Sequence, residues 1–406
     1  MRAAGAVLRL SNLQIDHHKK NQNNLETVVL DPAMRPNLHS WVEIDQVQVL
    51  KNIKIIKQVL GGAQLGVIIK GNAYGHGITP IIKILQAAPE VDWAISFCLS
   101  EAILARMSGF TRQLLVCGYA DGDVQDAILH DIDLILHDSA SLHRYLQAAK
   151  KIDKPLYVHI KVDTGLSRLG FTPEQAAQLI LELQNSQYII VRGLFSHFSE
   201  SEAEDNWFAK QQLSCFDSLL SKLENLKIKI PIVHLANTVA IFRLPNTHKS
   251  LVRIGAGVYG LRKNIRADLM PAVYNDLKPV ITWKSKIIQV RQIAAGSFIS
   301  YGRTFQTDQA MYVAAVPVGY ADGYDRGLSN NSVMYVNGVL APVLGRVCMN
   351  LTMIDITNVQ NTQVGDEVIL LGDLDGIRVT DFMQRLDTIA IDVTTGINWT
   401  ISRFLV

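Results

Sequence analysis

Short apolar runs alternate with longer amphipathic segments from Trp41 to about Val273. Short apolar runs bounded by polar and glycine residues are typical of buried parallel strands, and the segments between them have helical periodicity. The clearest helical patterns are Gln46–Leu60, Pro173–Gln184 and Trp207–Leu226. Eight strands that alternate with helices predict a parallel (β/α)8 barrel. The predicted strands are Gly66–Lys70, Asp92–Phe97, Leu114–Gly118, Leu134–His137, Leu156–Val162, Ile189–His197, Ile232–Leu235 and Leu251–Ile254.

The pattern changes after Lys278, where strand-like runs follow one another without long helices. Asn337-Gly338 is a strong hairpin-turn signal, and a helix is expected only within Val379–Asp392. The fold class is therefore α/β plus all-β, with a (β/α)8 barrel over residues 39–275 and a mostly β domain over residues 276–406. The predicted strands of this domain are Val280–Val290, Ala310–Val316, Val333–Val336, Val339–Leu344, Leu351–Ile356 and Glu367–Leu371.

Composition narrows the class of protein. The net charge of +2 gives no reason to expect binding to nucleic acid or to an anionic membrane, and no apolar run is long enough for a membrane helix. The four cysteines are scattered and lack metal-ligand spacing, so we expect reduced thiols in a cytoplasmic protein and no metal site. Arg9 interrupts the short apolar patch near the N-terminus, so residues 1–38 are interpreted as a disordered extension and not as an export signal.

Polar residues follow several of the predicted barrel strands at their carboxyl ends. This is the face on which barrels of this type build their active sites. Each residue alone has an ordinary structural explanation, and His197 in its apolar segment could be a satisfied core histidine. Their placement on one face nevertheless indicates a shared site. The residues are Lys70, Asp163, Thr164, Arg168, His197, Asn237, Thr238, Arg253 and Gly255.

Two of these positions suggest specific chemistry. A lysine that ends a buried strand is partly desolvated, which lowers its pKa and makes its amine nucleophilic toward carbonyls. Lys70 has this position, although a lysine that simply extends to water would look the same. The glycine-rich stretch 252–260 could expose backbone N–H groups to an anion such as phosphate, but a tight barrel closure would have a similar sequence.

Residues 70–77, Lys-Gly-Asn-Ala-Tyr-Gly-His-Gly, resemble the pyridoxal-phosphate lysine motif of alanine racemases, with Gly71 where the family usually has alanine. The segments 298–305, 317–326 and 345–349 also resemble signatures of that family, in the same order. The resemblance extends from Trp41 to the C-terminus. It implies an isomerase that uses pyridoxal 5'-phosphate to interconvert L-alanine and D-alanine, and so supplies D-alanine for peptidoglycan.

The resemblance also implies roles for individual residues. Lys70 would carry the cofactor, His197 would pack against its pyridine ring, and Arg253 would bond the ring nitrogen. An arginine does not give up its proton, so it would limit the electron sink of the ring. The remaining cofactor-binding residues, which lie mostly near the phosphate, would be Tyr74, Asn237, Thr238, Gly255, Ala256 and Trp399.

Racemisation removes a proton from one face of the substrate and returns one to the other, so it calls for two acid–base groups. The resemblance assigns these roles to Lys70 and Tyr301. It places Arg168 and Met349 at the substrate, and Lys161 where some family members have a carbamylated lysine. It further implies a homodimer in which Tyr301 and Met349 complete the partner's site.

The sequence departs from the family at Asn350, where aspartate is usual, and at Trp399, which replaces a common tyrosine. Three alternatives remain. A broad-spectrum amino-acid racemase would share the barrel and the lysine. A fold-related decarboxylase should pair the ring nitrogen with a carboxylate, which Arg253 disfavours. A non-catalytic pyridoxal-phosphate-binding protein would lack the second domain.

Overall fold

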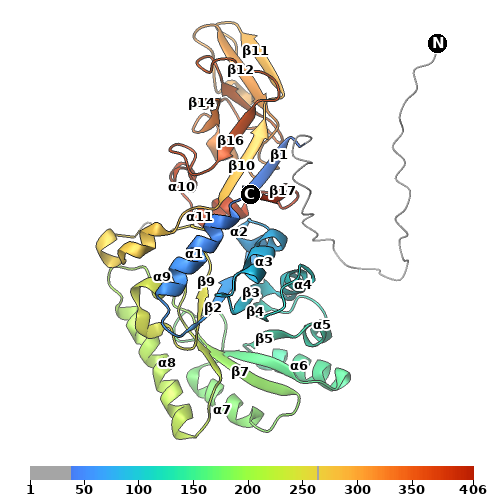
Figure 1. The fold of residues 1–406 in the computed structure, drawn as a ribbon, viewed down its shortest axis with the longest axis vertical. Coiled ribbons are helices and arrows are strands. Elements are labelled where there is room, and N and C mark those ends of the chain that lie inside the picture. Colours follow the sequence, from blue (N-terminus) through green and yellow to red (C-terminus); the bar gives the residue numbers. More distant parts are fainter. Residues whose placement is uncertain (1–37, 263–264) are drawn as a thin grey trace, which may run out of the picture.

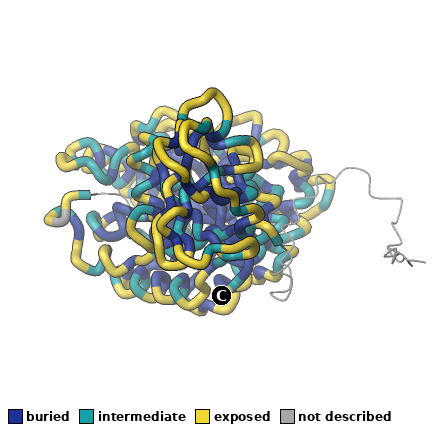
Figure 2. Tube along the Cα trace, turned by 90° about the horizontal axis from the view of Figure 1, so that it is seen from above, coloured by how far each residue is buried: buried dark blue, intermediate teal, exposed yellow. Residues whose placement is uncertain are grey.

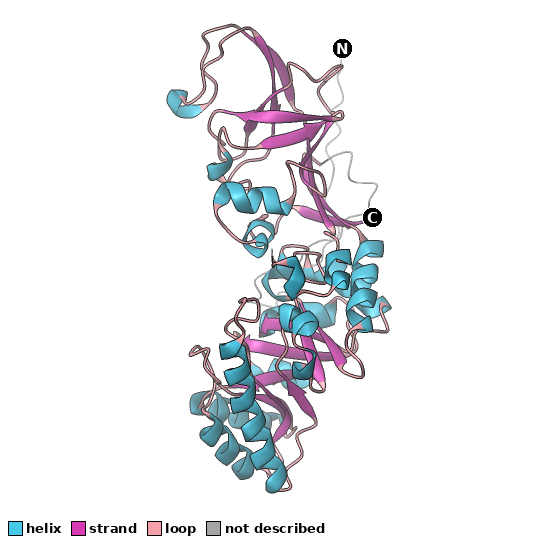
Figure 3. Cartoon of the chain, turned by 90° about the vertical axis from the view of Figure 1, so that its left-hand side faces the viewer, coloured by secondary structure: helices cyan, strands magenta, loops and turns pink. Residues whose placement is uncertain are grey.

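The computed structural model describes residues 38–262 and 265–406 and consists of a barrel at one end of the long axis and a β-sheet at the other (Figures 1 and 3). The barrel is closed by eight parallel strands in sequence order. This confirms the predicted (β/α)8 barrel, and each predicted strand overlaps an observed one. The strands are β2 (Gln64–Ile68), β3 (Trp93–Cys98), β4 (Gln113–Tyr119), β5 (Ile132–Leu136), β6 (Leu156–Lys161), β7 (Ile189–Phe195), β8 (Ile232–His234) and β9 (Leu251–Ile254).

Helices connect the strands and cover the outside of the barrel (Figure 1). Several begin at side chains that accept a hydrogen bond from a first-turn backbone N–H, as Asp45, Asp123 and Asp138 do, and Thr172 forms a capping box with Gln175. The helices are α1 (Gln46–Gln58), α3 (Ile78–Ala87), α4 (Leu99–Met107), α5 (Val124–Leu129), α6 (Ser139–Ile152), α7 (Pro173–Leu183), α8 (Trp207–Asn225) and α9 (Thr238–Arg243). The segment labelled α2 (Lys70–Tyr74) is a short left-handed turn and not an α-helix.

The second part is a nine-stranded sheet in the order β11-β12-β15-β14-β13-β16-β10-β1-β17. This confirms the mostly β C-terminal part. Short 3-10 helices also occur: η2 (Pro245–Thr247), η3 (Ala267–Leu269), η4 (Ala272–Asp276), η5 (Tyr301–Arg303) and η6 (Arg326–Leu328). The strands are β1 (Ser40–Ile44), β10 (Ile281–Lys286), β11 (Gln289–Ile293), β12 (Met311–Val316), β13 (Val333–Val336), β14 (Val339–Leu344), β15 (Thr352–Asp355), β16 (Glu367–Leu371) and β17 (Ser402–Leu405).

Strand β1 corrects the division of the chain. The sequence interpretation assigned residues 39–275 to the barrel, but β1 pairs antiparallel with β10 and parallel with β17, so it belongs to the sheet. The reason is that its apolar side chains Val42 and Ile44 are buried in the apolar core. Pairing between strands so far apart in the sequence leaves no local pattern that could reveal it.

Two further expectations for the C-terminal part are refined. The single predicted strand Val280–Val290 is two strands, β10 and β11. The chain changes partner between them, because the N–H of Ile287 donates to Asp366, just before β16, and the N–H of Ile288 donates to Ala315 in β12. The helix expected within Val379–Asp392 is present as α10 (Val379–Leu386) and α11 (Ala390–Thr395), separated at Asp387, whose φ is 50°.

One contiguous apolar core runs from the barrel into the sheet, and the tube in Figure 2 shows this buried interior surrounded by exposed loops. It includes Ile95 and Leu115 of the barrel and Trp283 and Ile354 of the sheet. None of the helices in the described ranges is long and apolar enough to cross a membrane. The expected extension at residues 1–38 lies, apart from Leu38, outside the described residues.

Candidate active site

A cavity of about 820 Å³ lies at the carboxyl ends of the barrel strands. It collects most of the residues that the sequence singled out: Lys70, Tyr74, Lys161, Arg168, His197, Asn237, Thr238, Arg253, Gly255 and Ala256. It also contains residues that sequence reasoning missed: Cys117, Ser201, Glu202, Arg262, Tyr274, Met383, Ile389, Ala390 and Ile391. The last four come from α10, α11 and their junction, so the C-terminal part closes one side of the cavity.

Lys70 does not end its strand, as the sequence suggested, but begins a tight turn after it. Strand β2 ends at Ile68, and the side chain of Lys70 is exposed toward the cavity. The next residues are left-handed: Gly71, Asn72 and Ala73 have φ between 52° and 61° with ψ between 46° and 51°, and Tyr74 has φ 56°. Each non-glycine residue in this conformation costs roughly 1–2 kcal/mol, so the turn stores backbone strain beside the cavity.

Hydrogen bonds within the segment stabilise this turn. Backbone N–H groups of Ala73, Gly75 and Gly77 donate to the carbonyls of residues 69, 71 and 72 at 2.8–2.9 Å. Nδ1 of His76 lies 3.0 and 2.9 Å from the carbonyls of Ala73 and Tyr74, so this nitrogen carries the proton and donates. Burial lowers the pKa of His76 to about 4, which keeps the ring neutral at physiological pH.

Tyr74, at the end of the turn, and the loop after β9 form a small polar cup. A β-carbon at Gly255 would lie 2.3 Å from Oη of Tyr74, so only glycine allows the hydroxyl to approach the backbone here. The N–H of Gly255 donates to Oγ1 of Thr238 at 3.1 Å. Asn237 caps α9 by accepting from Ala240 at 3.0 Å. Burial raises the pKa of Tyr74 well above its ordinary value, so Tyr74 remains a hydroxyl donor.

Arg253 is buried at the floor of the cavity. Its guanidinium donates to Nδ1 of His234 at 2.8 Å, to Nδ1 of His197 at 3.1 Å, and to the carbonyl of Ser196 at 2.8 Å. Burial lowers the pKa of Arg253 to about 10, which leaves it protonated at neutral pH. Because both histidines accept at Nδ1, each neutral ring carries its proton on Nε2.

The hydrogen-bond chain continues into the barrel interior. Nε2 of His234 lies 2.8 Å from Nδ1 of His159, and Nε2 of His159 lies 3.2 Å from a carboxylate oxygen of Asp133. Arg192 pairs with that carboxylate at 2.7 Å. With the proton of His234 on Nε2, each ring donates to the next group and the chain ends at an anion. Sequence reasoning missed Asp133, His159 and His234, although polar residues inside otherwise apolar strands are the signal that could have found them.

The side chains that line the cavity include two lysines and three arginines: Lys70, Lys161, Arg168, Arg253 and Arg262. Burial and the neighbouring charges of Arg168 and Arg253 lower the pKa of Lys161 to about 8. Burial, and then the charge of Arg253, lower the pKa of His197 well below its ordinary value. A cationic cavity with a hydroxyl-lined cup is suited to an anionic ligand that carries a phosphate.

Three predicted site residues lie outside this cavity. Tyr301, Met349 and Trp399 are 72%, 56% and 48% exposed. Tyr301 and Met349 belong to neighbouring loops, because Oγ of Ser300 donates to the carbonyl of Arg346 at 2.5 Å. Trp399 borders a separate hollow beside Gly71 and Asn72.

Asn350 and Trp399, the two residues that differ from the family's usual residue, have different surroundings. Asn350 donates from Nδ2 to a carboxylate oxygen of Asp322 at 3.3 Å, a contact in which an aspartate would place two carboxylates together. Trp399 retains a bulky aromatic side chain near the Lys70 turn but provides no hydroxyl.

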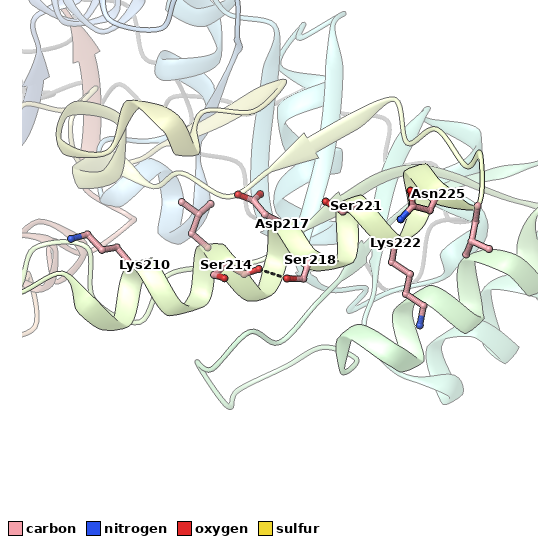
Figure 4. A pocket seen from close by; sticks show the side chains of 9 residues that line it. Lys210, Ser214, Asp217, Ser218, Ser221, Lys222 and Asn225 are labelled. Carbon is pink, nitrogen blue, oxygen red and sulfur yellow. Dashed lines mark hydrogen bonds between the residues drawn. The ribbon is translucent and has the colours of Figure 1, made fainter.

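Another hollow, of about 810 Å³, runs along the outer face of α8 (Figure 4). Ser214, Ser218 and Lys222 line it, and Ser218 donates to the carbonyl of Ser214 one turn earlier. Its lining consists of serines, lysines, Asp217, Asn225 and leucines of one surface helix and the turn after it, and contains none of the residues that the sequence singled out. The barrel cavity is therefore the candidate site.

Comparison with known proteins decides the family. Residues 44–263 match the family described as "Alanine racemase, N-terminal domain", and residues 280–405 match "Alanine racemase, C-terminal domain". The chain belongs to the alanine racemase family. Its relatives include alanine racemase of Halothermothrix orenii, 35% identical over 90% of this chain and 96% of that one, and alanine racemase 2 of Caldanaerobacter subterraneus, 34% identical over 90% and 94%.

Solved structures agree with this assignment. The crystal structure of alanine racemase from Streptomyces lavendulae aligns with a TM-score of 0.83 at 29% identity and covers 91% of this chain and 97% of that one. An alanine racemase structure from Clostridium difficile 630 aligns with a TM-score of 0.84 at 30% identity, covering 91% and 96%. Membership confirms the expected enzyme class, an isomerase, and the expected dependence on pyridoxal 5'-phosphate.

The residues present fit that cofactor. The cup of Tyr74, Thr238 and Gly255 offers a hydroxyl donor and a close backbone approach for a phosphate, and Lys70 offers an amine in the same cavity. Arg253 offers a donor that stays protonated. The match to the C-terminal family and the presence of the second sheet also argue against a lone-barrel binding protein.

Proposed function

We propose that this protein racemises alanine with pyridoxal phosphate, in the cytoplasm, and supplies D-alanine for peptidoglycan as the family generally does. The observation that carries the proposal is that Lys70, Tyr74 and Arg253 face one cavity in a chain of this family. When bound, the cofactor supplies an electron sink that makes the α-proton of alanine removable.

Lys70 is proposed to hold the cofactor and to act as one base. Its side chain lines the same cavity as Arg168, Lys161 and Arg253, and a lysine amine is a group that can form a covalent bond with a carbonyl carbon. The left-handed turn fixes Lys70 at one end and Tyr74 at the other. Tyr74, Asn237, Thr238, Gly255 and Ala256 are the proposed phosphate side of the site, and His197 its ring side.

Arg253 is proposed to bond the ring nitrogen. It remains protonated, and its contacts with His197, His234 and backbone carbonyls hold it rigidly. A cation there disfavours a protonated ring, which suits racemisation and argues against the decarboxylase alternative. Arg168 is proposed to bind the substrate carboxylate.

Lys161 is proposed to be carbamylated. Reaction with carbon dioxide needs a neutral amine, and a pKa of about 8 makes about a tenth of the amine neutral at pH 7. The resulting anion would lie near Arg168 and Arg253, the two cations that already perturb Lys161.

The second base is proposed to be Tyr301 from the other subunit of a homodimer. Tyr301 lies outside the cavity of its own chain, and Phe298, Met349, Leu351 and Trp399 of the C-terminal part are exposed as well. Exposed apolar side chains of this kind are typical of a protein interface. In the partner's cavity, Nε2 of His197 would have its proton available for the tyrosine, because Nδ1 already accepts from Arg253.

A chiral assay tests the proposal. Purified protein with pyridoxal phosphate should convert pure L-alanine into an equal mixture of enantiomers, with serine slower and with lysine and arginine much slower. Comparable turnover of lysine or arginine would favour the broad-spectrum racemase instead. Formation of an amine with release of carbon dioxide would favour the decarboxylase.

A further inference from the structure

Arg403, in the last strand of the chain, is a fully buried cation with unusual partners. Its guanidinium donates to four backbone carbonyls: those of Gly75, Ile397, Asn398 and Ile401. Among the described residues, no carboxylate neutralises it, and burial alone lowers its pKa to about 10. A buried arginine bonded only to carbonyls holds backbone segments together by a rigid planar fork.

The contact with Gly75 crosses from the sheet to the active-site turn. Nε and Nη2 of Arg403 lie 3.2 and 3.1 Å from the carbonyl oxygen of Gly75, which ends the left-handed turn after Lys70. Arg403 itself pairs with Val42 in the nine-stranded sheet. The other carbonyls of the turn accept from donors of their own segment, as those of Gly71 and Asn72 do.

The backbone around Gly75 is packed too closely for any other residue. A β-carbon there would lie 1.9 Å from the carbonyl oxygen of Thr394 in α11. Arg403 and the end of α11 therefore meet the same residue from the C-terminal part of the chain. A strained turn persists only when the surrounding structure holds it in place, and here Arg403 and α11 do so.

We propose that Arg403 is a positioning residue for Lys70. By binding the Gly75 carbonyl it holds the turn left-handed, and so fixes Lys70 and Tyr74 at the separation that the cofactor needs. This inference rests on the proposed role of Lys70, since the turn matters only if its lysine holds the cofactor. It also assigns a task to the C-terminal strand that is separate from any contact with a second subunit.

A merely structural arginine would behave differently, and the chain offers a matched control. Arg106 also donates to four backbone carbonyls, those of Phe110, Arg112, His130 and Asp131, and burial lowers its pKa as well. None of these partners belongs to the Lys70 turn. Arg403→Met and Arg106→Met each remove one carbonyl-bound guanidinium, and only the first removes a donor from the turn.

Hydrogen exchange in the cofactor-free protein is the primary test. The amides of Ala73, Gly75 and Gly77 should exchange on the order of 10- to 100-fold faster in Arg403→Met, because two charge-assisted bonds are lost. Amides of β3 and β4 should keep their protection, and Arg106→Met should leave the turn unchanged. Equal exchange of the turn in Arg403→Met and wild type, or equal acceleration in Arg106→Met, would overturn the proposal.

Uptake of the cofactor by Lys70 is the second readout. Borohydride reduction at timed intervals should show slower labelling of Lys70 in Arg403→Met, and the bound cofactor's visible absorbance should titrate at a shifted pH. Arg403→Lys, which keeps the charge without the planar fork, should give an intermediate result if Arg403→Met does not fold. A loosened turn with labelling as fast as in wild type would overturn the positioning role. Absence of labelling at Lys70 in wild type would instead refute the proposed function and leave the exchange result standing.

Discussion

The barrel half of the site and the sheet residues proposed to complete it are built in opposite ways. In the barrel, Arg253 is 5% exposed, and its guanidinium donates to backbone carbonyls and to His234, whose ring is fixed in turn by a hydrogen bond to His159. In the sheet, Tyr301 is 72% exposed and Met349 is 56% exposed. The difference teaches that a single chain can preorganise the cavity side of the site, and it is consistent with the proposal that a second chain supplies the other side.

The largest expected effect is at Lys70. Lys70→Ala should reduce racemase activity on the order of 10⁴-fold, because it removes both a base and the attachment of the cofactor. Lys161→Ala is the matched control in the same cavity and should leave borohydride labelling at Lys70 intact. If borohydride labels a lysine other than Lys70 in the wild-type protein, Lys70 is not the lysine that holds the cofactor.

Breaking the buried hydrogen-bond chain in the barrel should lower the free energy of unfolding more than a change in the exposed part of the sheet does. Asp133→Asn should lower the free energy of unfolding by about 3 kcal/mol, because it leaves Arg192 without its carboxylate in a largely buried setting. Asn350→Asp, in the exposed half, should change it by only about 0.5 kcal/mol. Urea denaturation of both variants checks this, and similar losses would remove the contrast.

The buried histidines predict a loss of stability in mild acid. His76, His197 and His234 all have pKa values lowered by burial, to about 4 for His76. Below pH 6.5 the unfolded chain binds protons that the folded chain does not, so the free energy of unfolding should fall as the pH falls. The slope approaches about 1.4 kcal/mol per pH unit for each histidine.

Unfolding measured between pH 7 and pH 5 checks that slope. His76→Gln keeps a donor for the turn carbonyls and should reduce the slope, since one of the three groups no longer titrates. An unchanged slope would show that His76 is not held neutral.

A smaller loss of stability than that of Asp133→Asn is expected at Gly71, where the family usually has alanine. A β-carbon there would meet only Thr395 Cγ2, at 3.5 Å, so the side chain fits, but φ is 61°. Gly71→Ala should therefore destabilise the protein by about 1 kcal/mol through the left-handed backbone alone. A thermal melt of the cofactor-free protein measures it, and a stabilised variant would contradict the strain assigned to this turn.

The sequence predicts those site residues that lie at the end of a strand or directly follow one in the chain. The placement of Lys70, Arg253 and Thr238 around one cavity could be predicted because the carboxyl ends of strands leave a local signal, whereas Tyr74 and Ala256 were indicated only by the family resemblance. Strand β1, the His159–His234 pair and the contact of Arg403 with Gly75 could not, because each joins segments that are distant in the chain. The left-handed turn was also missed, since its sequence resembles any loop after a strand and its conformation depends on packing.

The central claim is that the active site is shared between two chains, and mixed dimers test it most directly. Lys70→Ala and Tyr301→Phe subunits, each inactive alone, should form heterodimers after subunit exchange in which one composite site is intact. At equal mixing about half of the dimers are mixed, each with one of two sites restored, so about a quarter of wild-type activity should return. No recovery, with subunit exchange confirmed, would contradict the shared site, and full activity of Tyr301→Phe alone would contradict the second base.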